Sequence, residues 1–282
     1  MTPTPPGPSA DNSPAPTGEN AASPSSGAMD WPAAICWKTH CPACCGRVKS
    51  EGGKMEGEGG KMSQEGQLAW HDRVPARVTE LADQISPHHA ALVMVDMQND
   101  FVHDDGVFVK QWGKTNRWIK PIVPRCRELL AAARRAKVLV VHLRVINDLA
   151  RNPVSWHNFW GPPSCVIEGS WGADFIEELK PSDHEIVVTK TTYDGFCDTP
   201  LDSLLRKLRV KTLVFAGIDS DVCVRDTAAR GFALGYTPVF VSDAMASDSE
   251  VAHAGVLQSF AEHYGKVVLT GDIAAAWQAT GE

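Results

Sequence analysis

From about residue 88 onward, short apolar runs rich in β-branched side chains alternate with stretches in which apolar residues recur at helical spacing. The runs are almost continuously apolar, which is typical of parallel strands buried on both faces. We therefore predict strands at 91–96, 138–143, 185–190, 212–217, 238–242 and 267–269. Helices are predicted near 120–136, 173–180, 200–209, 222–235 and 250–264.

This alternation predicts the α/β class, with a mainly parallel, doubly wound sheet that carries helices on both sides. In such a sheet, ligands bind beyond the carboxyl ends of the strands. The residues that follow each predicted strand are therefore the candidates for chemistry.

Residues 1–85 show no sustained apolar periodicity. The segment 1–29 is rich in Pro, Ser, Ala and Gly, and 50–66 is rich in Gly, Glu and Lys. Neither segment can bury enough apolar surface to offset the entropy of ordering the chain. We predict a disordered low-complexity leader over 1–85 and one folded domain over 86–282. Internal methionines leave open a start further along the chain.

The whole chain of 282 residues has 43% hydrophobic and 22% charged residues, which is ordinary for a globular protein. A formal charge of −7 argues against a nucleic-acid partner, because phosphate binding needs a basic surface. The sequence contains no run of 18 or more apolar residues, so no membrane span is predicted. The N-terminus lacks the basic start and apolar stretch of a secretory signal, so we expect a cytoplasmic location.

The eight cysteines fall into two groups. Cys36, Cys41, Cys44 and Cys45 crowd together in the leader beside His40, at a spacing too tight for a zinc site and without a second pair. We therefore expect no metal and no cofactor. The other four are scattered singly, at 126, 165, 197 and 223, and are expected to be thiols in a reducing compartment.

Three unlike ionisable groups follow predicted strands. Asp96 ends the first strand, Lys190 ends the third, and Cys223 stands in the first turn of the helix after strand 212–217. A helix N-terminus and an ammonium both stabilise a thiolate nucleophile, and a carboxylate can move the proton to a leaving amine. Backbone N–H groups in the turn 217–222 would face an oxyanion. The set predicts acyl transfer, although a buried cysteine alone is more often a core residue.

Three motifs carry a resemblance to a known family. They read D-M-Q-N-D-F at 96–101, T-K-T-T-Y-D-G-F at 189–196 and G-I-D-S-D-V-C-V at 217–224. In order and spacing they resemble the isochorismatase-like cysteine hydrolases, over about 88–272. The resemblance implies the three-layer α/β/α sandwich of the isochorismatase-like hydrolase fold, and a homo-oligomer.

The resemblance also implies an Asp96–Lys190–Cys223 catalytic triad. It further implies a non-proline cis peptide bond at Ile218–Asp219 and an oxyanion hole formed by the backbone N–H groups of Asp219 and Cys223. Family members often have a small residue in place of Asp219. A carboxylate there would oppose an oxyanion, so we expect this side chain to turn away or to bond a donor.

The branch of the family follows from further residues. Val145 and Asn147 occupy the places of the metal-binding Asp-x-His of nicotinamidase-like members, and isochorismatase proper lacks Cys223. Segments such as G-S-W-G-A-D and L-V-F-A-G-I resemble the ureidoacrylate amidohydrolases of pyrimidine degradation. The resemblance implies a cysteine-dependent amidohydrolase that cleaves a small ureido or amide substrate through a thioester. Biuret and N-carbamoyl-amino-acid hydrolases, or a catalytically weak member acting as a binding module, are the alternatives.

Residues near the same strand ends are candidates for substrate binding. Phe101, Tyr193 and Phe196 would form an apolar wall, and Gln98 or its neighbour Asn99 would bond an amide. Arg144 would grip a substrate carboxylate, or else be an exposed arginine. The connection 156–165 is unusually aromatic and predicts a lid or a subunit contact, in which His157 and Asn158 are further candidates.

Overall fold

The structure is a computed structural model that describes residues 77–279. The disorder predicted for 1–76 and the cysteine-rich segment lie outside the described residues. Six strands form one sheet: β1 (Ala90–Val95), β2 (Leu139–Val145), β3 (Ile186–Lys190), β4 (Thr212–Gly217), β5 (Thr237–Met245) and β6 (Lys266–Val268). Each of the six predicted strands is confirmed to within a few residues.

All neighbouring strands pair in parallel, in the order β3-β2-β1-β4-β5-β6. Every residue of the central strands β1 and β4 is buried, as their continuous apolar runs require. The chain moves outward from β1 in one direction through β2 and β3, and in the other through β4, β5 and β6. The crevice between β1 and β4 is therefore the topological switch point, where ligands of doubly wound sheets bind.

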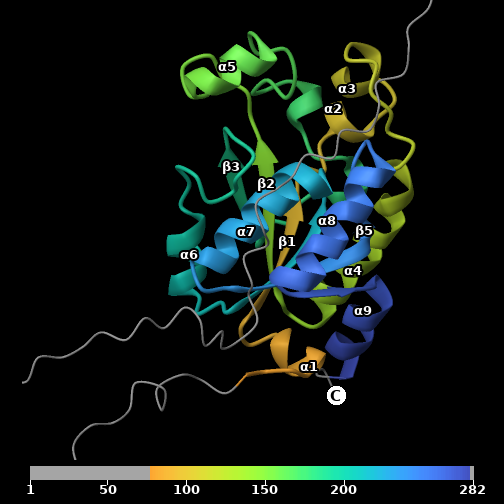
Figure 1. Ribbon diagram of the computed structural model, residues 1–282, viewed down its shortest axis with the longest axis vertical. Coiled ribbons are helices and arrows are strands. Elements are labelled where there is room, and N and C mark those ends of the chain that lie inside the picture. Colours follow the sequence, from red (N-terminus) through yellow and green to blue (C-terminus); the bar gives the residue numbers. More distant parts are fainter. Residues whose placement is uncertain (1–76, 280–282) are drawn as a thin grey trace, which may run out of the picture. The chain divides into compact units, whose positions relative to one another are not determined.

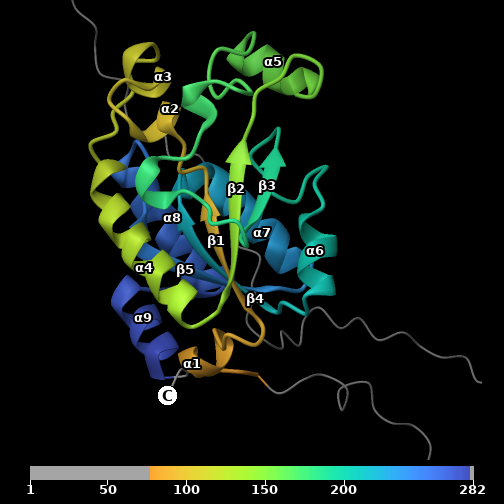
Figure 2. The same ribbon diagram turned by 180° about the vertical axis from the view of Figure 1, so that it is seen from behind.

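Helices cover both faces of the sheet (Figures 1 and 2). One face carries α4 (Val123–Arg135) and α9 (Thr270–Ala279), and the other carries α6 (Leu201–Lys207), α7 (Arg225–Ala233) and α8 (Glu250–His263). A separate apolar core lies on each side, with Leu129 and Trp277 in one and Leu205 and Phe260 in the other. The predicted three-layer α/β/α sandwich is confirmed. Within 77–279, no helix is long and apolar enough to cross a membrane.

The helix predicted at 173–180 is wrong. Two 3₁₀ turns, η3 (Trp171–Ala173) and η4 (Glu177–Leu179), flank an extended stretch. In that stretch Phe175 forms an antiparallel bridge with Gln98, and the Ile176 N–H donates to the Met97 carbonyl at 3.0 Å. The Ile176 N–H, which would donate within a helix, therefore donates instead to the segment that follows β1.

The folded domain begins earlier than predicted. Residues 81–84 form a short helix, α1 (Leu81–Gln84), and the Ile85 side chain is fully buried. The Trp277 indole N–H donates to the Ile85 carbonyl at 2.8 Å, which ties this segment to α9. The border expected after residue 85 is thus placed too late.

The carboxyl ends of β1 and β2 point toward a cap of short helices (Figure 1). These are α2 (Asn99–Val102), α3 (Val107–Lys110) and α5 (Val154–Trp160), none of which the sequence pattern predicted. α5 overlaps the aromatic connection 156–165, for which a lid or a subunit contact was predicted. The cap brings distant segments over the switch point, where the candidate site lies.

Replacing Ile85 with Ala should lower the free energy of unfolding by about 2–5 kcal/mol, because the change removes a fully buried side chain and leaves a cavity. Urea unfolding followed by circular dichroism measures this difference. The matched control is Val78→Ala, since that side chain is 50% exposed and should cost no more than about 0.5 kcal/mol. Equal, small effects of both substitutions would show that α1 does not belong to the folded unit.

Candidate active site

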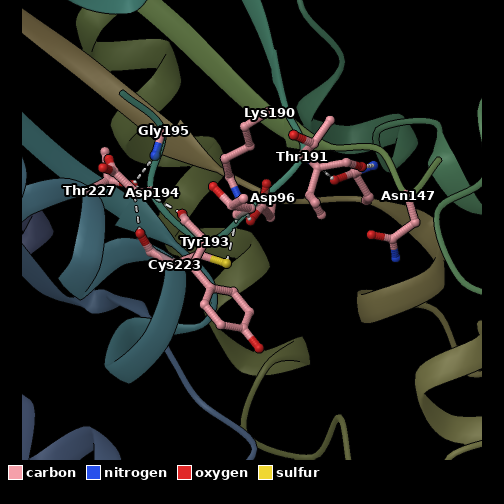
Figure 3. Close-up of polar contacts among 12 residues, drawn as sticks. Asp96, Asn147, Lys190, Thr191, Tyr193, Asp194, Gly195, Cys223 and Thr227 are labelled. Atoms are coloured by element: carbon pink, nitrogen blue, oxygen red, sulfur yellow. Dashed lines mark hydrogen bonds and ion pairs between the residues drawn. The ribbon is translucent and has the colours of Figure 1, made fainter. Parts of the chain in front are cut away.

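The three predicted catalytic side chains lie together at the carboxyl edge of the sheet (Figure 3). Lys190 Nζ lies 2.7 Å from Asp96 Oδ2 and 3.4 Å from Cys223 Sγ. The side chains of Lys190 and Asp96 are 0% and 2% exposed. Lys190 Nζ also donates to the Thr192 carbonyl at 3.1 Å. A carboxylate, an ammonium and a thiol are therefore in mutual reach, largely out of water.

The turn after β4 delivers the thiol to this point. Gly217 has a φ of +108°, and a Cβ there would collide with the Val95 carbonyl, so only glycine lets β4 approach β1 this closely. The next bond, Ile218–Asp219, is cis, as the resemblance predicted. A π-helical turn, η5 (Ser220–Val224), follows and leads into α7. Cys223 lies in this turn, two residues before the regular helix begins at Arg225.

Thr227 joins the cysteine turn to the segment after Lys190. Its fully buried hydroxyl donates to the Cys223 carbonyl at 2.7 Å and accepts from the Gly195 N–H at 2.9 Å (Figure 3). Because one hydroxyl bonds both segments, the position of Cys223 relative to Lys190 is fixed by the fold rather than by the two side chains alone.

Burial dominates the electrostatics of the three groups. It raises the pKa of the Cys223 thiol well above the ordinary range, and the nearby Lys190 charge only partly opposes this. Burial also raises the pKa of Asp96, against the effect of Lys190. For Lys190, burial lowers the pKa, but the charges of Asp96 and Cys223 raise it further than burial lowers it. Burial therefore favours the neutral form of the thiol, and the Asp96 carboxyl lies within ion-pair distance of the Lys190 ammonium.

A helix N-terminus and an ammonium were expected to stabilise a thiolate at Cys223. Burial is the largest effect on the pKa of this thiol, and it acts in the opposite direction to the Lys190 ammonium. The thiol needs a base, and the Asp96 carboxylate, made more basic by burial, lies within the same group.

Asp219 does not turn away from the site, contrary to expectation. It lines the cavity next to Cys223, and its Oδ1 is shielded from solvent with no hydrogen-bond partner among residues 77–279. Burial raises the pKa of Asp219 to about 8, helped by the charges of neighbouring carboxylates. Within the same residues, no acceptor takes a hydrogen bond from its backbone N–H. That N–H is available for an oxyanion, and the side chain is available for a ligand.

A cavity of about 160 Å³ opens onto the thiol. Cys223 lines it, whereas Asp96 and Lys190 are buried and do not. Phe101 and Tyr193 line it as predicted. So does the aromatic connection, through Trp156, Trp160 and residues 161–164. Trp160 donates its indole N–H to the Tyr193 hydroxyl at 2.7 Å, which holds α5 against the segment after β3.

Three other predicted substrate-binding residues do not line the cavity. Gln98 is fully buried, and its amide bonds the backbone of Val145 in both directions at 2.9 Å. Arg144 donates its Nε–H to the Thr189 hydroxyl at 2.9 Å. Phe196 packs in the apolar core against Tyr236. The structure therefore does not bring these three side chains to the cavity. Asn99, His157 and Asn158 also lie outside the lining, and a role in substrate binding stays a prediction for all six residues.

Sequence reasoning missed several residues that do line the cavity. Lys114 and Asp248 form an ion pair there with Nζ and Oδ2 2.7 Å apart. Trp112 stacks on Trp160 at 5.2 Å between ring centroids. A signal for the first segment was the dense V-F-V-K-Q-W-G-K run at 107–114, shortly after the first motif. Within residues 77–279, no three His, Cys, Asp or Glu side chains are grouped so as to hold a metal.

Comparison with known proteins identifies the family of this chain and solved structures with a similar fold. The isochorismatase domain family matches residues 90–272. The ureidoacrylate amidohydrolase RutB of Enterobacter sp. (strain 638) is 31% identical over 221 residues, which cover 72% of this chain and 94% of that protein. The resemblance read from the three motifs is confirmed at the level of the family.

Solved structures agree. A cysteine hydrolase from Pseudomonas syringae pv. phaseolicola 1448A has a TM-score of 0.62 and 26% identity, covering 70% of this chain and 96% of its own. The N-carbamoylsarcosine amidase from Thermoplasma acidophilum has a TM-score of 0.56 and 30% identity, covering 64% of this chain and 96% of its own.

Replacing Lys190 with Met should lower the free energy of unfolding by about 3–5 kcal/mol, because it leaves the Asp96 carboxylate buried without its ion-pair partner. The double variant Asp96→Asn/Lys190→Met should recover part of this loss. Lys120→Met serves as control, since Lys120 pairs with Asp104 at 2.6 Å on the exposed surface. Urea midpoints that shift equally for Lys190→Met and Lys120→Met would contradict the buried ion pair.

The alkylation rate of Cys223 by iodoacetamide should rise about tenfold per pH unit and reach no plateau by about pH 9, because its pKa is raised and only the thiolate reacts. Asp96→Asn removes a charge that raises this pKa and should move the profile to lower pH. Lys190→Met should move it to higher pH. Peptide-resolved mass spectrometry separates Cys223 from the half-buried Cys197. A plateau near neutral pH would mean a resting thiolate.

Proposed function

Since the chain belongs to the isochorismatase family, we propose that it is a cysteine-dependent amidohydrolase that cleaves a C–N bond of a small ureido or amide substrate. One observation carries the proposal: Cys223 Sγ faces a small cavity and lies 3.4 Å from a lysine that is ion-paired to a buried carboxylate. Relatives named as amidohydrolase, amidase and cysteine hydrolase support the same reaction class.

The proposed reaction begins when the Cys223 thiol gives its proton to Asp96 as sulfur attacks the substrate carbonyl. The oxyanion that forms accepts hydrogen bonds from the backbone N–H groups of Asp219 and Cys223. Asp96 then protonates the leaving nitrogen, and the C–N bond breaks to give a thioester and a free amine or ammonia. Throughout, the Lys190 ammonium stabilises whichever of Asp96 and the sulfur carries the negative charge.

Water completes the cycle. Asp96 accepts a proton from the water that attacks the thioester, and the thiol leaves with that proton. A carbamoyl thioester yields carbamate, which decomposes to carbon dioxide and ammonia, so the net reaction consumes water and needs no cofactor.

For the substrate, the proposal covers only the chemical group that reacts. Ureidoacrylate and N-carbamoylsarcosine, which relatives carry in their names, share a ureido group, and this supports a ureide for this chain. A ureidoacrylate-like substrate and a place in pyrimidine degradation stay predictions, as do biuret and N-carbamoyl amino acids. The cytoplasmic location and the homo-oligomer also stay predictions.

Replacing Cys223 with Ser should lower ammonia release by at least about 10³-fold, because the attack loses its nucleophile. The assay offers ureidoacrylate, biuret, N-carbamoylsarcosine and nicotinamide to the wild type and the variant side by side. Cys197→Ser is the control, since that thiol lies outside the cavity and its loss should leave turnover unchanged. A folded wild type that turns over none of these compounds would favour the binding-module alternative.

A further inference from the structure

The acidic and basic side chains that line the cavity are not matched in number. The lining contains one basic side chain, Lys114, and two acidic ones, Asp219 and Asp248. Lys114 Nζ and Asp248 Oδ2 are 2.7 Å apart, so this pair is already neutral. Asp219 remains, with a shielded Oδ1 that has no hydrogen-bond partner among the described residues. Ionising Asp219 there is costly unless a ligand supplies a partner for the carboxylate.

The remaining lining is mostly aromatic. Six rings contribute to it, from the cap helices and from the segment after β3: Phe101, Phe108, Trp112, Trp156, Trp160 and Tyr193. The faces of Trp, Tyr and Phe rings carry negative potential and attract organic cations, and they do so more strongly where water is excluded. The rings and the carboxylate therefore favour the same kind of ligand.

A clamp for a carboxylate is missing from the lining. Arg144, the candidate for that role, bonds Thr189 and does not line the cavity. Lys190 is buried behind Cys223 and is paired with Asp96. A substrate carboxylate would thus meet the Asp248 carboxylate, and that of Asp219 once it ionises, with only the already paired Lys114 to offset them. Like charges placed together oppose binding.

We propose that the cavity takes ureides or amides whose non-reacting end is an organic cation, such as a primary ammonium. This inference rests on the proposed function for the reacting end, where Cys223 attacks the carbonyl. The cation would be held by Asp219 and by the aromatic rings, with Asp248 adding to the attraction.

The pH dependence of binding follows from the groups around Asp219. The charged or titratable groups that face it from all packed elements are Asp96, Lys114, Asp221, Cys223 and Asp248. Burial holds the pKa of Asp219 at about 8 in the free protein, so it is mostly protonated at pH 7. A bound cation lowers that pKa and expels the proton. Affinity for a cation should therefore rise with pH up to about 8 and then level off, whereas affinity for a carboxylate should fall through the same range.

The test compares three end groups at matched length: 4-ureidobutylammonium, N-butylurea and 4-ureidobutanoate, together with the two-carbon homologues, so that chain length does not decide the result. Ammonia release gives kcat/KM for the wild type. We expect the cation to exceed the neutral compound by at least ~10-fold and the carboxylate to be the poorest.

Asp219→Asn should reduce the cation-to-neutral ratio of kcat/KM by about 10-fold, and the ratio cancels any loss common to both compounds. The matched control is Asp221→Asn, which removes a carboxylate from the same turn that does not line the cavity, and it should change the ratio less. Should Asp219→Asn not fold, the wild-type ratio and its rise between pH 6 and 8 decide alone.

The outcomes separate the two proposals. Turnover with no preference for the cation, or with a preference for the carboxylate, overturns this inference and leaves the amidohydrolase standing. If no compound is turned over, calorimetry measures the binding of the same compounds to Cys223→Ser. Selective binding of the cation would support the cation site but not the reaction. Absence of selective binding would overturn both the cation site and the proposed reaction.

Discussion

The buried ion pair between Lys190 and Asp96 is the constraint on which the site depends. Each charge is almost completely removed from water, and either one alone at that place would be strongly unfavourable. The two residues end strands that are not neighbours, since β2 lies between β3 and β1. Their pairing therefore requires the parallel register that places both strand ends at the same edge of the sheet. A shift of that register would separate the two residues and leave each charge buried without a partner.

The same pair decides how the thiol is held. Lys190 serves two acidic groups, and Asp96 is close enough to carry the negative charge itself. Burial raises the pKa of Cys223 more than the ammonium lowers it, which favours the neutral thiol before a substrate enters. Under the proposed mechanism, proton transfer from the thiol to Asp96 would then be part of the attack. The buried ion pair would thus both join the two strand ends and activate the nucleophile.

The sequence predicted the sheet and the three central groups because both depend on local signals: continuous apolar runs, and ionisable residues directly after them. It could not predict which neighbouring side chains face the cavity. Gln98 follows a strand end, yet its side-chain amide forms hydrogen bonds with the backbone of Val145 and does not face the cavity. The stretch 173–180 has a helical pattern, but its backbone pairs with the segment after β1. Lys114 and Asp248 are far apart in the chain, and only the fold brings them together.

Asp219 links specificity to catalysis through charge. A carboxylate beside an oxyanion would slow the reaction, but with a pKa held at about 8 by burial it mostly carries a proton at neutral pH. A cationic substrate would ionise Asp219 and cancel the new charge at the same time, so the surroundings of the oxyanion stay neutral overall. A substrate carboxylate would instead add a negative charge with nothing to cancel it. Under the proposed preference, Asp219 would therefore select the charge of the ligand without a net electrostatic cost to the reaction.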